Sequence, residues 1–183
     1  MKAVSYIHMA LLKKAFLCSF IIWLIGFILG VHYKIDFTSL NNYGEGVSLF
    51  TQKEPLSLSL DILRNNLYVL IFNLTGVVVL GISTAINLVF NGFFLGQMIS
   101  AGISNLSLGK TILIVLPHSL ELLGLWLGGC VGFAGAKMLI QYFVTKDAIR
   151  EDNLFLLGKV FMVAVLLTVL AAFTEVYVSM RII

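Results

Sequence analysis

The sequence predicts an all-α membrane protein, a polytopic transmembrane helix bundle with about five spans in a single domain. Of its 183 residues, 60% are hydrophobic and 11% are charged, and the mean hydropathy is +1.02. Soluble domains carry about 25% charged residues, so this composition excludes a soluble fold. The longest polar stretch, residues 32–61, is too short to form a stable core of its own. The small net charge of +3 indicates no nucleic-acid-binding surface.

The first predicted span covers residues 15–31, which contain no charged residue, and a basic arm with Lys13 and Lys14 precedes it. A cleaved signal peptide is the alternative interpretation. Because the basic residues come late and no small-residue cleavage site follows, we expect a retained helix. Gly26 and Gly30 give this helix a smooth face for close packing.

Residues 32–60 are polar and predict a loop, with a short surface helix near 56–62. A second span is predicted over 65–81 and a third over 85–102. A tight connection at 81–84 must separate these spans, because one unbroken helix would far exceed the bilayer thickness.

Polar and small residues share faces on these two spans. We expect interhelical hydrogen bonds from Asn66, Asn73, Asn87 and Asn91, and we place Asn66 and Asn91 in a polar core. A water-lined path is the alternative. Gly92 and Gly96, four residues apart, should lie at a helix–helix contact.

The fourth span, predicted over 117–142, begins with Pro117, which suits the first turn of a helix. His118 and Glu121 follow, three residues apart, so they lie on one side of the helix and can meet. The fifth span, 159–180, contains an isolated acid, Glu175, which either faces the interior or reaches toward water.

Glycines continue the face of Glu121 along the fourth span. Gly124, Gly128 and Gly132 recur every four residues and should form a helix-packing strip. The acid and the strip therefore face the same side, and we expect protein there because an ionisable side chain in lipid is costly.

Three interpretations of His118 and Glu121 follow. They form a packing lock within an interior polar cluster, they act as protonatable gates on a solute or peptide path, or they are catalytic or metal-binding. A zincin pattern needs two histidines at i, i+4 around a glutamate, and it is missing. We therefore predict no metal, no cofactor and no catalytic residue, with His118 and Glu121 as the candidates if the protein is an enzyme.

Two segments together carry a family resemblance: Asn91-Gly92-Phe93-Phe94-Leu95-Gly96, and Pro117-His118-Ser119-Leu120-Glu121 with its glycine-rich continuation. With Asn65-Asn66 opening the preceding helix, this pairing resembles the stage II sporulation protein M family over about residues 15–180. Ser119 stands where the family usually has glycine.

The resemblance implies a multi-span protein without an established catalytic chemistry. One branch of the family acts with partners in peptidoglycan remodelling during engulfment of the forespore. Another is associated with circular bacteriocins, in their maturation, export or producer immunity. The small soluble mass and the apolar character of this chain favour the bacteriocin-associated branch.

We therefore expect a non-enzymatic membrane subunit of a complex that matures or exports a hydrophobic peptide, or protects its producer. The alternatives are a sporulation-type scaffold that docks partners through residues 32–60, and an intramembrane peptide-processing enzyme. No nucleotide-binding G-x-x-x-x-G-K-[ST] loop is present, so ATP coupling would need a partner such as an ATP-binding cassette ATPase, contacted through residues 144–158.

The bias of lysine and arginine toward alternate connections predicts the orientation. We expect a multi-pass protein of the bacterial cytoplasmic membrane, with its N-terminus in the cytoplasm and its C-terminus outside. Its partners should be the lipid bilayer, other membrane subunits and a hydrophobic peptide.

Overall fold

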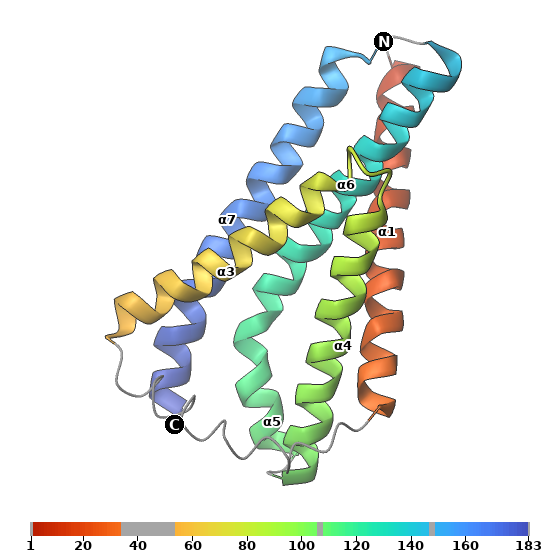
Figure 1. Cartoon of the computed structure of the whole chain (residues 1–183). Coiled ribbons are helices and arrows are strands. Elements are labelled where there is room, and N and C mark those ends of the chain that lie inside the picture. Colours follow the sequence, from red (N-terminus) through yellow and green to blue (C-terminus); the bar gives the residue numbers. More distant parts are fainter. Residues whose placement is uncertain (1, 34–53, 106–107, 147–148, 183) are drawn as a thin grey trace.

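The structure is a computed structural model, and it describes residues 2–33, 54–105, 108–146 and 149–182. These ranges form a helical bundle that contains no strand, which confirms the predicted fold class (Figure 1). The helices are α1 (Lys2–His32), α3 (Pro55–Thr75), α4 (Ile82–Asn105), α5 (Leu108–Val115), the 3₁₀ turn η2 (Leu116–His118), α6 (Ser119–Thr145) and α7 (Glu151–Ile182).

Within the described part of the chain, four helical segments are long and apolar enough to cross a membrane: Met9–His32, Ile82–Asn105, Ser119–Thr145 and Glu151–Tyr177. Helix α3 is not among them, because Asp61, Arg64 and several asparagines lower its hydropathy. It lies obliquely across the bundle (Figure 1). The second predicted span, 65–81, therefore stays a prediction.

Helix α3 also begins and ends earlier than the predicted 65–81. Pro55 occupies its first turn, where the missing N–H has no helical partner, so the helix starts within the segment expected to be loop. The rest of the predicted loop, residues 34–53, lies outside the described residues.

The connection between α3 and α4 is a turn at residues 76–81, not at the predicted 81–84. It closes with Leu80 and Gly81 in the left-handed region, at φ values of 55° and 87°. Glycine adopts this conformation without steric cost. The apolar run Val77–Val78–Val79 concealed the turn, while Ser83 and Thr84 belong to the first turn of α4.

Helices α1 and α4 run side by side and make the most extensive helix–helix contact in the bundle (Figure 1). A Cβ atom on Gly26 or Gly30 would overlap the main chain of Val89 or Phe93. In return, a Cβ atom on Gly92 or Gly96 would overlap the main chain of α1 at Trp23 or Phe27. Each helix therefore presents glycines to the backbone of the other.

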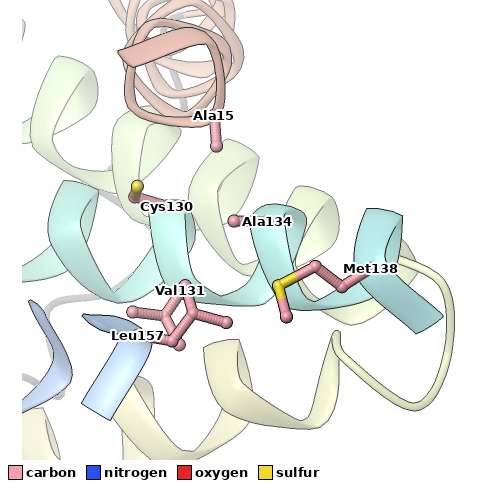
Figure 2. Packing of buried hydrophobic residues seen from close by; sticks show 6 residues of the cluster. All are labelled: Ala15, Cys130, Val131, Ala134, Met138 and Leu157. Atoms are coloured by element: carbon pink, nitrogen blue, oxygen red, sulfur yellow. The ribbon is translucent and has the colours of Figure 1, made fainter. Parts of the chain in front are cut away.

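Helix α6 is the central element and packs against α1, α3, α4 and α7. Figure 2 shows one of its buried clusters, in which Ala15 of α1 approaches Cys130 and Ala134, while Leu157 of α7 packs beside Val131. A second cluster is aromatic, with the rings of Trp23 and Trp126 edge to face at 5.2 Å between centroids.

Candidate functional site

Three ionisable side chains meet at one end of the α6–α7 pair. His118 Nδ1 lies 3.2 Å from Glu121 Oε2 and 3.5 Å from Glu175 Oε2. We call these residues the ionisable triad. Their side chains are 24%, 27% and 19% exposed, so each is half-buried.

Local structure explains the first pair. Residues 116–118 form a 3₁₀ turn that leads directly into α6. His118 and Glu121 are therefore about one helical turn apart and lie on the same side. Glu175 comes from the last turns of the antiparallel helix α7, which ends beside the start of α6. The triad thus links η2, α6 and α7.

A second polar group lies among α3, α4 and α6, and its members are neutral. Asn87 Nδ2 donates to Asn73 Oδ1 at 2.9 Å and lies 2.9 Å from the main-chain oxygen of Val69. Asn73 Nδ2 donates to the main-chain oxygen of Leu125 at 3.3 Å, and Asn91 Nδ2 donates to Asn87 Oδ1 at 2.9 Å. We call Asn73, Asn87 and Asn91 the asparagine group.

The hydroxyl of Thr84 extends this second group. It donates to the main-chain oxygen of Asn73 at 2.8 Å, at the point where α3 ends. A Cβ atom on Gly132 or Gly76 would overlap this hydroxyl, so both glycines make room for the hydrogen bond. The group is therefore held by close helix packing as well as by hydrogen bonds.

The structure divides the predicted polar core between these two groups. His118 and Glu121 belong to the triad, and Asn91 belongs to the asparagine group. Asn66 is buried and accepts a long hydrogen bond of 3.5 Å from Asn65, while its Nδ2 has no hydrogen-bond partner among the described residues. The two groups contact α6 about one helical turn apart: Glu121 belongs to the triad, and the main-chain oxygen of Leu125 accepts from Asn73.

The predicted glycines of α6 face more than one neighbour. A Cβ atom on Gly124 would lie 2.9 Å from Thr168 Oγ1 on α7. On Gly128 it would lie 2.7 Å from Leu70 Cδ2 on α3, and on Gly132 it would meet the end of α3 and Thr84. The strip that was expected to face one helix therefore turns from α7 to α3.

Sequence reasoning singled out Asn73, Asn87 and Glu175 but did not pair Asn73 with Asn87, and it did not place Glu175 beside His118. The sequence shows that each is a polar residue in an apolar helix, which is the available signal. Their partners lie on helices distant in sequence, so helical spacing alone does not identify them.

The two groups differ in what they can do chemically. In the asparagine group, all three side-chain NH2 groups donate to oxygens within the bundle and link helices. The triad places one imidazole nitrogen and two carboxylates within reach of a shared proton or cation, with partial access to the surroundings.

An uncharacterised protein of Methanocaldococcus jannaschii is 34% identical over 125 residues, which are 66% of this chain and 70% of that protein. No solved structure matches the chain.

The sequence profile described as stage II sporulation protein M matches residues 15–180, nearly the whole chain and the same extent as the resemblance in the motifs. Together with several membrane-spanning helices, this match establishes a multi-pass membrane protein. The chain belongs to the stage II sporulation protein M family.

Proposed function

We propose that the protein is a non-enzymatic membrane scaffold, a subunit that holds other proteins together in the bilayer. The observation that supports this proposal is the asparagine group, whose three side-chain NH2 groups all donate to oxygens inside the bundle. A transport path needs polar groups that remain available to water or solute, whereas interhelical hydrogen bonds stabilise a fixed arrangement.

The finer proposal is that the scaffold serves a complex that matures or exports a hydrophobic peptide of the circular-bacteriocin type, or protects its producer. Its support is the sequence itself, which is very apolar, has little soluble mass and contains no nucleotide-binding loop. Energy for export would come from a partner, such as an ATP-binding cassette ATPase.

The proposed contact for that partner is the end of the bundle where α6 ends and α7 begins, opposite the ionisable triad. Phe143 and Val144 at the end of α6 are 60% and 75% exposed, and Phe155 at the start of α7 is 67% exposed. Aromatic residues are enriched in protein interfaces, and the charged Glu151 and Asp152 nearby would belong to their polar rim.

We propose that this end faces the cytoplasm of a bacterium, with the C-terminus outside. Ala15, Met138 and Leu157 pack in one cluster, so the adjacent Lys14 and Lys137 lie at the same level of the bundle. A collar of positive charge on one side is the usual mark of the cytoplasmic face. Cysteine accessibility at residues 143 and 177 from each side of the membrane tests this orientation.

Deletion and co-purification in the native host test the scaffold proposal. We expect a tagged protein, extracted in mild detergent, to co-purify with an ATPase or another membrane subunit. Phe155→Ala should weaken this association, whereas the control Phe94→Ala, at an exposed aromatic elsewhere on the bundle, should not. Deletion should abolish peptide export or producer immunity. A deletion strain with unchanged peptide production, export and immunity would contradict the finer proposal.

The sporulation-type scaffold is the second candidate, and the description of the matching family favours it. Its proposed docking segment, residues 32–60, lies mostly outside the described residues. The neighbouring genes separate the two candidates, since a small peptide gene supports the first and sporulation genes support the second.

An intramembrane enzyme is the third candidate, favoured by the meeting of His118 and Glu121 with Glu175. His118→Gln and Glu121→Gln would then abolish the processed peptide while co-purification persists. Loss of association together with product would favour a structural role for these residues.

A further inference from the structure

The ionisable triad contains the donor set of a metal site, which goes beyond the scaffold proposal and does not depend on it. Each of its residues offers one atom, an imidazole nitrogen or a carboxylate oxygen, and these atoms all lie within 4.8 Å of one another. The donors come from three segments, η2, α6 and α7, so a shared ligand would join them.

The charges of the triad do not balance internally. Both Glu121 Oε2 and Glu175 Oε2 approach the same atom, His118 Nδ1. That nitrogen carries at most one hydrogen, so it cannot donate a good hydrogen bond to both carboxylates. When both carboxylates are ionised, even a charged imidazolium leaves one negative charge uncompensated within the triad, and unpaired charge is costly where water is partly excluded. A divalent cation would satisfy both carboxylates at once.

The two distances from His118 fit a tetrahedral ion, and the two carboxylate oxygens lie within 4.8 Å of each other. Zinc binds histidine nitrogen and glutamate oxygen at about 2.0–2.2 Å, which places tetrahedral ligands roughly 3.3 Å from one another. The two separations from His118 Nδ1 are 3.2 and 3.5 Å. Helical bundles that bind metals in their cores also pair a glutamate with a histidine three residues apart, although in the order Glu-x-x-His, the reverse of the order here.

We propose that His118, Glu121 and Glu175 together bind one divalent transition-metal ion of the zinc type. The imidazole favours zinc over magnesium and calcium, which prefer sites made of oxygen ligands alone. Three protein ligands leave the fourth tetrahedral position to water. The ion ties the start of α6 to the end of α7, beside the close contact of Gly124 with Thr168.

Metal analysis of the purified protein tests this proposal. The full chain carries a tag without histidine, is reconstituted in nanodiscs, stripped with chelator and reloaded with zinc alone. We expect about one zinc per protein by mass spectrometry. Cobalt in place of zinc should give the visible absorption of a tetrahedral site.

Conservative variants locate the ion. Glu175→Gln keeps the size of the side chain but removes its charge, and it should weaken zinc binding at least about 10-fold. The matched control is Glu151→Gln, an exposed acid at the other end of the same helix, which should bind zinc as wild type does. Size-exclusion profiles establish that each variant is folded.

Two results would overturn the proposal. One is a folded wild-type protein that retains no zinc and shows no cobalt absorption, which would make the triad a hydrogen-bonded cluster only. The other is zinc binding by Glu175→Gln that equals the wild-type affinity, which would place the ion elsewhere.

Discussion

The asparagine group and the ionisable triad contact α6 about one helical turn apart, at Leu125 and at Glu121, yet they differ in charge and in exposure. In the asparagine group, Asn73 is fully buried, uncharged and bonded to two other helices. In the triad, every side chain is ionisable and partly exposed, and two acids share one imidazole nitrogen. The side-chain NH2 groups of the asparagine group all donate within the bundle, whereas the triad has two carboxylates for one imidazole.

A polar group that only stabilises a membrane protein can therefore be distinguished from one that is suited to bind a ligand. Amide side chains in a bundle can satisfy one another without a net charge, so they stabilise without needing water or ions. Ionised carboxylates near a bilayer are costly unless a positive charge pairs with them. The following experiments test whether the asparagine group is structural and the triad ligand-dependent.

The largest expected effect comes from disturbing the packing beneath the asparagine group. Gly132→Val should destabilise the protein by about 3 kcal/mol, because the new side chain meets the main chain of Asn73 and the hydroxyl of Thr84. Thermal or denaturant unfolding in detergent measures the loss. Gly158→Ala is the control, since a Cβ atom there meets nothing within 4 Å. Equal stability of the two variants would contradict the packing described.

Removal of zinc should have the next largest effect, and only through the triad. If free zinc stands at 100 times its dissociation constant, chelation should lower wild-type stability by about 2.7 kcal/mol. The protein carrying Glu175→Gln should show little change on chelation. A wild-type unfolding transition that ignores both zinc and chelator would remove the proposed distinction between the groups.

Asn73→Leu should cost about 1–2 kcal/mol, because it removes the hydrogen bonds to Asn87 and to the main chain of Leu125 while keeping the side-chain volume similar. Unfolding measured with and without zinc should give the same loss. A zinc-dependent loss would instead mean that the asparagine group and the triad are coupled.

The smallest effect should come from the turn between α3 and α4. Thr75 Oγ1 and Ser83 Oγ lie 2.9 Å apart in a partly buried hydrogen bond. A double-mutant cycle with Thr75→Val and Ser83→Ala should give a coupling of about 0.6 kcal/mol, the usual value for such a bond in a membrane bundle. A coupling near zero would show that the turn is held by its backbone alone.

Local periodicity was sufficient for part of this architecture. Long apolar runs predicted the helical membrane fold, and the three-residue spacing predicted that His118 and Glu121 could meet, as their hydrogen bond shows. Both inferences depend on neighbours within one helix. The motifs around Asn91 and His118 also indicated the family that the comparison establishes.

The rest depended on which helices are neighbours in space. Glu175 follows Glu121 by 54 residues in the sequence, and the residues around Glu175 give no indication that its partner is a histidine. Asn73 and Asn87 pair across a turn that the valines at 77–79 disguise as a continuous span. The short helix expected near 56–62 and the second predicted span are one continuous helix, α3, because the polar residues between them do not interrupt it.

The reciprocal seating of glycines between α1 and α4 also bears on biogenesis. Because α1 docks on α4 and not on its neighbour in sequence, the first span enters the bilayer long before its principal partner has been synthesised. During that interval Gly26 and Gly30 have only lipid to pack against. A nascent chain halted before residue 82 therefore lacks the main packing partner of its first helix.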